Sequence, residues 1–338
     1  MAVLGADRVV GTDRVDVHAH GLPPALPPLA RRYAGDWPEL VATGPCTADI
    51  TLGGRHFRSV DSRCWDAARR LAEMDAEGVA LQVVSPIPVT FSYGLDPTGA
   101  AELSRLQNEW IAGLVRDHPD RFSGLGTVPL QAPEVAAAMV AEIVAQLGLP
   151  GVEIGSNVAG RMLDDPELEP FFAACAECDA VVFVHPWQVL GAGRLTRHGL
   201  GYSVGMPAET AAAAASLVFG GVLDRHPRLR VVLAHGGGSF TALLPRIDRC
   251  AEMLPGVTAP QQPPSAYARR FWYDSLVYDP EALRRLVATV GADRVMIGTD
   301  YPFPIAERPA GQGVTDAGFD DATAAAVRAG TARTLLKL

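Results

Sequence analysis

Lysine is almost absent from this sequence, because Lys337 is the only lysine among its 29 basic residues. A lysine side chain is needed to form a Schiff base with a carbonyl substrate or a carbamate that bridges two metal ions. We therefore expect neither chemistry here, and any cation in a binding site should be an arginine.

Long hydrophobic runs are also lacking, although 48% of the 338 residues are hydrophobic. No stretch approaches the roughly 20 apolar residues that span a bilayer. The first residues, MAVLGADRVVGTDR, contain no basic segment followed by an apolar one, as a secretory signal would. We expect a cytoplasmic protein with one large core.

An excess of positive charge is missing too, because the formal net charge is −9. Nucleic acid and anionic membranes would repel such a protein at long range, so we expect neither as a partner. The five cysteines form an odd and scattered set. This favours reduced thiols over a disulfide framework.

Short apolar runs recur along the chain, and nearly all of them end in polar residues or glycine. This pattern is typical of parallel strands that lead into loops. Helix-like stretches separate the runs, and several begin with proline and end with glycine. We predict eight strands, at 14–20, 80–86, 122–128, 151–156, 180–186, 230–236, 271–275 and 294–300.

Eight such alternations predict an α/β fold, the (β/α)₈ TIM barrel. A doubly wound open sheet is the alternative, but no glycine-rich dinucleotide fingerprint follows the first strand. We expect a single domain over residues 1–338. Residues 22–64 break the alternation and include a strand-like piece at 50–60, so we predict a small insertion after strand 1 that packs over the barrel mouth.

Histidine and aspartate stand at the ends of the predicted strands. Residues two apart on a strand face the same side, so His18 and His20 should both point toward the barrel axis. Because the strand ends share one face, His185 and Asp300 should join them. Three imidazoles and a carboxylate suit zinc, while nickel, iron and cobalt accept the same ligand types. His235 ends the sixth strand and is the weakest candidate as a direct ligand.

Several longer motifs carry a resemblance to a known family. They are spread from about residue 14 to the C-terminus and include DVHAHGLP at 16–23, EMDAEGV at 73–79, FVHPW at 183–187, AHGGGSF at 234–240 and IGTDYPFP at 297–304. Taken together they resemble the amidohydrolase superfamily. Within it, the sequence is similar to the decarboxylase branch typified by 2-amino-3-carboxymuconate-6-semialdehyde decarboxylase.

This resemblance implies a barrel that binds one zinc ion through the four candidate ligands, with His235 beside the metal as a catalytic acid or base. It also implies that Arg58 binds the substrate carboxylate, and that Arg246 reaches into the neighbouring subunit's site in a homodimer. Arginine suits this role because it forms paired, charge-assisted hydrogen bonds. The apolar walls for a flat substrate are expected from Phe57, Trp187 and Phe303.

The sequence departs from the family's pattern at a few positions of the expected pocket. Gly94, Gly199 and Tyr202 stand where relatives usually carry tryptophan, which implies a larger or differently shaped cavity with Tyr202 among its substrate-binding residues. Binuclear relatives commonly carry a carbamylated lysine at the end of strand four. Here that strand holds Glu153, a candidate bridge to a second metal or an inward-facing polar residue, and we expect one metal.

The function that we expect is metal-dependent, non-oxidative decarboxylation of a small conjugated or aromatic carboxylic acid. Loss of CO₂ leaves an electron pair on carbon, and a divalent cation provides an electron sink. Two routes stay open. In one, His235 takes a proton from water that adds to the substrate; in the other, a proton is delivered to the carboxylate-bearing carbon. The alternatives are a hydrolase of a lactone, amide or ester and a non-catalytic binding protein.

Overall fold

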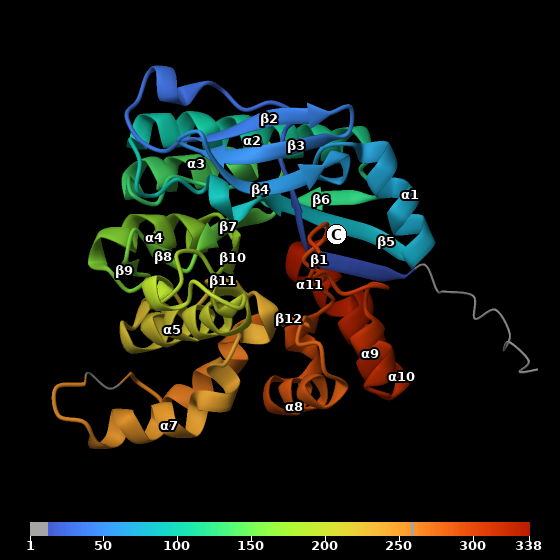
Figure 1. The fold of residues 1–338 in the computed structure, drawn as a ribbon. Coiled ribbons are helices and arrows are strands. Elements are labelled where there is room, and N and C mark those ends of the chain that lie inside the picture. Colours follow the sequence, from blue (N-terminus) through green and yellow to red (C-terminus); the bar gives the residue numbers. More distant parts are fainter. Residues whose placement is uncertain (1–12, 258–259) are drawn as a thin grey trace, which may run out of the picture.

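The computed structural model describes residues 13–257 and 260–338, and its centre is a set of parallel strands surrounded by helices (Figure 1). Each of the eight predicted strands is present. The third, predicted at 122–128, and the last, predicted at 294–300, are shorter than predicted. The barrel strands are β1 (Arg14–Gly21), β5 (Val79–Pro86), β6 (Phe122–Gly124), β7 (Gly151–Gly155), β10 (Val181–His185), β11 (Arg230–Leu233), β12 (Phe271–Asp274) and β13 (Val295–Met296).

These strands form two parallel ladders, in the orders β1-β5-β6 and β13-β12-β11-β10-β7. Two seams join the ladders. At one seam Gly126 pairs with Val152, and at the other Ala19 pairs with Tyr301, each as a single parallel bridge. At the second seam the backbone N–H of His20 also donates to the carbonyl of Tyr301 at 2.6 Å. The bridges complete a ring of eight strands, so the predicted TIM barrel is confirmed.

The helices begin where the sequence places aspartate and proline. The carboxylates of Asp66, Asp96 and Asp279 accept hydrogen bonds from the first backbone N–H groups of their helices. No helix in the described ranges is long and apolar enough to cross a membrane. The helices are α1 (Ala67–Glu77), α2 (Pro97–Asp117), α3 (Pro133–Ala145), α4 (Glu169–Glu177), α5 (Met206–Phe219), α6 (Val222–Arg225), α7 (Phe240–Met253), α8 (Pro280–Val290), α9 (Gln312–Asp316), α10 (Asp321–Ala325) and α11 (Thr331–Leu336).

Two apolar layers lie on the two sides of the strands. The inner layer fills the ring with side chains from different strands, such as Val17, Val83 and Phe183, and Leu335 of α11 closes it at one end. The outer layer packs alternate strand residues against the surrounding helices. This alternation of sides is the reason that the strands read as nearly continuous hydrophobic runs.

Residues 22–64 form a small antiparallel sheet of β2 (Pro38–Gly44), β3 (Thr47–Leu52) and β4 (Arg55–Asp61). The strand-like piece at 50–60 is the β3–β4 hairpin, which turns at Gly53 and Gly54, both with positive φ. One face of the sheet packs against Ile87 and Phe303, which follow β5 and β13. The sheet therefore lies at the end of the barrel where the strands terminate.

Candidate metal centre

A β-bulge in β1 aims the two histidines of that strand into the barrel. Val17 already faces the barrel interior, so regular alternation would turn His18 outward. Between Asp16 and Ala19, however, β1 advances by three residues while its partner β5 advances by two. The extra residue re-aims the following side chains. The ring of His18 consequently packs inside the barrel, 5.0 Å from the ring of Phe183.

Four side chains from three strand ends converge inside the barrel mouth. The Nε2 atoms of His18 and His20 are 3.1 Å apart, and Oδ1 of Asp300 lies 3.2 Å from Nε2 of His20. The ring of His185 lies 5.1 Å from the ring of His20, between centroids. One ligand atom from each of these four buried residues lies within 4.8 Å of the others. The structure thus brings the four predicted ligands together.

The hydrogen bonds of the three histidines leave one nitrogen of each ring free for a cation. Donation from Nδ1 leaves the lone pair on Nε2. Two such lone pairs 3.1 Å apart repel each other unless a cation lies between them, and Nε2 of His185 is buried without a partner. The donor set therefore fits a divalent metal ion. The Nδ1 contacts, at 2.7–3.0 Å, are His18 to Asp274, His20 to the Pro86 carbonyl and His185 to the Pro186 carbonyl.

The charges around the cluster favour a positive group at its centre. Burial opposes a charged imidazole at His18, but the hydrogen bond to Asp274 and the nearby carboxylate of Asp300 raise its pKa to about 9. Burial likewise disfavours the Asp300 carboxylate, yet the hydrogen bond from His20 and the charge of His18 lower its pKa to about 2. A divalent ion at this place would bind the Asp300 carboxylate and take the position of a proton on Nε2 of His18.

His235 lies at the end of β11 beside the four ligands without being one of them. Its Nε2 is 4.0 Å from Oδ2 of Asp300, and its Nδ1 is buried without a hydrogen-bond partner. Burial and the neighbouring His18 lower its pKa to about 4, so the ring is neutral at pH 7. A neutral imidazole with an unengaged nitrogen at the edge of a metal site can take up or release a proton.

Asp274 is a functional residue that the sequence analysis missed. Its carboxylate accepts hydrogen bonds from Nδ1 of His18 and from the backbone N–H groups of His235 and Gly236, at 2.7–2.8 Å. It thus orients one ligand and holds the backbone of His235, which has a left-handed φ of 56°. Its position in the sequence could have indicated this role, because Asp274 lies at the end of the seventh predicted strand, just as the ligands lie at the ends of theirs.

Glu153 lies close to the ligands but outside their group. Its Oε1 is 3.8 Å from Nδ1 of His20, and neither carboxylate oxygen has a hydrogen-bond partner. Burial raises the pKa of this carboxyl group well above its ordinary value. Within residues 13–257 and 260–338, no second group of three or more candidate ligands accompanies it. The geometry favours a single metal, with Glu153 as an inward-facing polar residue.

Arg58 on β4 lies among aromatic side chains at the barrel mouth. Its guanidinium carbon is 4.2 Å from the centre of the Phe303 ring, and the group donates a hydrogen bond to the hydroxyl of Tyr202 at 3.2 Å. Phe303 in turn lies 5.3 Å from the His20 ring, between centroids, which connects the arginine to the metal cluster. Five of the six predicted substrate-binding residues meet here: Arg58, Tyr202, Phe303, Phe57 and Trp187.

Arg246, the sixth predicted substrate-binding residue, does not join this group within one chain. It is exposed on α7, which lies at the opposite edge of the molecule from the β2–β4 sheet (Figure 1). Large apolar side chains near it are also exposed, among them Leu243, Met253 and Leu254.

The closed barrel and the three-histidine, one-aspartate cluster at its strand ends define a metal-binding (β/α)₈ barrel of the enzyme type. Residues 15–338 match the amidohydrolase family, and the chain belongs to that family.

Several proteins with named activities are similar to this chain. The chain is 43% identical over 302 residues to 2-amino-3-carboxymuconate-6-semialdehyde decarboxylase of Dictyostelium discoideum, covering 88% of this chain and 84% of the relative. Among solved structures it resembles 5-carboxyvanillate decarboxylase of Sphingomonas paucimobilis, with 30% identity, a TM-score of 0.77 and coverage of 82% and 84%. The corresponding enzyme of Novosphingobium aromaticivorans, crystallised with manganese and 4-hydroxy-3-methoxy-5-nitrobenzoic acid, is 26% identical, with a TM-score of 0.77 and 82% of each chain covered.

Proposed function

We propose that this protein is a metal-dependent, non-oxidative decarboxylase of a small conjugated or aromatic carboxylic acid. The observation that carries the proposal is that a four-ligand cation site, a neutral histidine and an arginine stacked on aromatic rings share one barrel mouth. The named relatives support the same chemistry, because the enzymes from Dictyostelium and Sphingomonas are both decarboxylases.

Each group has a distinct task in the proposed reaction. The bond between the carboxylate and its carbon breaks, the electron pair stays on that carbon, and a proton takes the place of CO₂. A bound divalent ion supplies an electron sink and polarises substrate oxygens. Arg58 anchors the carboxylate through paired hydrogen bonds, and His235 is the catalytic residue that moves the proton.

The aromatic residues line the proposed substrate site. Phe303 lies between the metal cluster and Arg58. Phe57 and Trp187 form the neighbouring wall, and their ring centroids are 6.1 Å apart. Around Gly94 and Gly199, no atom lies within 4 Å of the position that a Cβ would take. Both glycines are exposed, so this space faces solvent, and the larger substrate cavity stays a prediction.

Zinc is the metal that we propose for this site. Three imidazole nitrogens and one carboxylate are ligand types that Zn²⁺ prefers, and expansion to five-coordination would leave a position for substrate or water. Manganese in the Novosphingobium relative shows that a related site accepts a different ion. Elemental analysis of protein purified without chelators should find about one zinc per chain; one manganese per chain would replace this assignment.

We also propose that the active assembly is a homodimer in which Arg246 of one chain completes the site of the other. Arg246 is exposed and lies beside exposed apolar residues of α7. An arginine that anchors a carboxylate needs a substrate within reach, and in the proposed dimer the partner's site supplies one. Burial of Leu243 and Met253 against a second copy would supply the apolar part of such an interface.

A carbon-balance assay tests the proposed function. Metal-replete protein is incubated with muconate semialdehydes, hydroxybenzoates and lactones, and headspace CO₂ and product mass are measured together. We expect one CO₂ for each molecule of an acid consumed, and none from a His185→Ala control that lacks one ligand. A ring-opened product that keeps every carbon would identify a hydrolase instead.

A further inference from the structure

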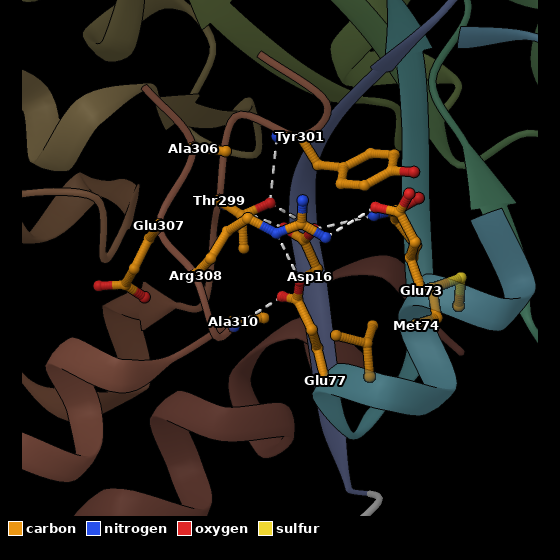
Figure 2. Close-up of a pocket in the computed structure, with 12 residues that line it drawn as sticks. Asp16, Glu73, Met74, Glu77, Thr299, Tyr301, Ala306, Glu307, Arg308 and Ala310 are labelled. Atoms are coloured by element: carbon orange, nitrogen blue, oxygen red, sulfur yellow. Dashed lines mark hydrogen bonds and ion pairs between the residues drawn. The ribbon is translucent and has the colours of Figure 1, made fainter. Parts of the chain in front are cut away.

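A buried carboxylate that the proposed reaction does not use lies on the outer side of β1. Asp16 is 1% exposed and points away from the barrel interior, toward α1 and the segment that follows β13. Figure 2 shows it in a small pocket with Glu73 and Glu77 of α1 on one side and Thr299 and Tyr301 on the other. It precedes the histidine pair by two residues and marks the start of the bulge in β1.

The hydrogen bonds of Asp16 connect three segments of the chain. Within the bulge, Oδ1 accepts from the backbone N–H of His18 at 3.2 Å. From the neighbouring strand β5, the side-chain amide of Gln82 donates to Oδ2 at 3.1 Å. From the segment after β13, Thr299 donates twice, with its hydroxyl at 2.8 Å and its backbone N–H at 3.1 Å. All of these donors are uncharged groups, and both carboxylate oxygens of Asp16 act as acceptors.

These bonds tie the histidine-bearing strand to the aspartate ligand. Thr299 directly precedes Asp300, whose backbone N–H donates to the carbonyl of His18 at 2.8 Å. The hydroxyl of Thr299 also accepts a hydrogen bond from the backbone N–H of Tyr301 at 3.1 Å. Asp300 has a left-handed φ of 64°, which a non-glycine residue adopts only when its surroundings hold it there. One carboxylate therefore fixes the backbone on both sides of the metal site.

A buried arginine balances the charge of Asp16 through an intervening amide. Arg70 of α1 is 1% exposed and donates to the side-chain oxygen of Gln82 at 2.8 and 3.1 Å. The same guanidinium donates to the backbone carbonyl of His20 at 2.8 Å. A buried charge without a compensating partner is costly, and a fully hydrogen-bonded network of this kind holds its members in one arrangement. Here that arrangement is the bulge that aims the imidazoles.

We propose that Asp16, acting through Thr299 and Gln82, is a positioning residue for the metal centre. It contacts neither metal nor substrate. Its carboxylate holds the β1 bulge and the backbone of Asp300 in register, so that three of the four ligand atoms meet at one point. The inference concerns the geometry of the metal site and does not depend on the reaction, so a different substrate would leave it intact.

The hydroxyl of Thr299 is the link that can be removed with the least disturbance. Thr299→Val keeps the shape of the side chain and removes its hydroxyl, whereas Thr299→Ser keeps the hydroxyl. Thr331→Val is the matched control, because the Thr331 hydroxyl is also buried and donates to the Ala292 carbonyl in another part of the molecule. Each metal-free variant is titrated with Co²⁺, whose absorption spectrum reports both affinity and ligand geometry.

We expect Thr299→Val to bind Co²⁺ roughly 10- to 100-fold more weakly than the parent and with shifted absorption bands, as for other groups that orient metal ligands. Thr299→Ser should restore both affinity and spectrum, and Thr331→Val should match the parent. Thermal unfolding of the metal-free proteins should show similar losses of stability in the two valine variants. A purely structural role would give that shared loss of stability without the change in Co²⁺ binding.

Parental Co²⁺ affinity and spectrum in Thr299→Val would overturn the proposal, as would an equal effect in Thr331→Val or a failure of serine to restore binding. If Thr299→Val does not fold, Asp16→Asn takes its place, since asparagine keeps the volume and loses the charge and one acceptor oxygen. Weakened binding with altered bands in this variant supports the proposal. If neither variant folds, the carboxylate serves the fold as a whole and the positioning role is rejected.

Discussion

At the residue scale, His235 differs from the three ligand histidines in how its ring is held. Each ligand ring has its Nδ1 fixed by an oxygen acceptor, whereas Nδ1 of His235 is buried and unpartnered. A fixed ring presents one lone pair to a cation, and an unfixed neutral ring can exchange a proton. Histidine therefore has two proposed tasks in this site: three rings bind the metal, and the ring of His235 transfers a proton.

Replacement of His235 by alanine should separate these tasks. We expect His235→Ala to keep about one metal per chain and to lose roughly 10²- to 10⁴-fold in kcat, the usual contribution of a positioned acid or base. Metal analysis and steady-state kinetics measure the two quantities. His56→Ala, at an exposed histidine of β4, is the control and should retain parental kcat. Normal turnover in His235→Ala would refute the proton-transfer role.

Arg58 should determine how tightly the acid binds. Arg58→Met keeps an apolar chain against Phe303 and removes the charged donors, so KM should rise roughly 10- to 100-fold, as expected for a lost charged hydrogen bond. Tyr202→Phe removes the hydroxyl that accepts from Arg58 and should produce a smaller rise. Arg55→Met, at an exposed arginine of the same strand, is the control. An unchanged KM in Arg58→Met contradicts the anchoring role.

The metal ligands could be predicted from the sequence, but the groups that orient them could not. His18, His185 and Asp300 stand at strand ends, and the rule that strand ends share one face brings them together. The bulge at Asp16 leaves no mark in the pattern of hydrophobic residues, so the need for it appears only in the register of β1 against β5. Which oxygen holds each Nδ1 is a property of tertiary packing and cannot be read from the order of residues.

At the scale of elements, α5 controls the loop that follows β10. Glu209 of α5 is buried and accepts hydrogen bonds from the hydroxyl of Ser156 at 3.1 Å, the amide of Asn157 at 2.9 Å and the backbone N–H of Leu190 at 2.7 Å. The same two side chains bond to the backbone of Trp187. One carboxylate thus fixes the loop that carries a wall of the substrate site.

Removal of this carboxylate should loosen the loop and spare the metal. Glu209→Ala removes an acceptor shared by three donors, of which Ser156 and Asn157 keep the Trp187 carbonyl, so the free energy of unfolding should fall by about 1–3 kcal/mol and KM should rise. Urea unfolding and kinetics check the two effects, and metal content should stay at the parental value. Glu177→Ala, at an exposed position of α4, should change stability by less than about 0.5 kcal/mol. A stable Glu209→Ala protein with parental KM would contradict this role for α5.

Element boundaries were harder to predict than the elements themselves. Residues 208–227 form one of the helix-like stretches of the sequence, but the structure divides them into α5 and α6, because Gly221 adopts a φ of +67° and interrupts the helix. The strands β6 and β13 are short because each lies next to a seam where the ring closes through a single bridge. Hydrophobic periodicity indicates that a strand is present, but it does not indicate how far the ladder of hydrogen bonds extends.

At the scale of the whole molecule, one end of the barrel brings together every proposed active-site group except Arg246. The cluster, His235 and the aromatic walls lie at one end of the barrel, but Arg246 lies on the exposed face of α7. In a two-fold symmetric dimer, a residue that completes the partner's site does so at both sites. Two inactive variants with defects at different residues should then rescue each other.

Mixing Arg246→Met and His235→Ala proteins tests this arrangement. A mixed dimer has one site with both residues intact, formed by the His235 of one chain and the Arg246 of the other. After dissociation and random reassociation about half of the dimers are mixed, so activity should recover to roughly a quarter of the parental value. Each variant reassociated alone is the control and should stay inactive. No recovery in a mixture whose hybrid dimers are verified by mass would place Arg246 in the site of its own chain or outside the reaction, because only an arginine shared between chains allows two defective subunits to form one complete site.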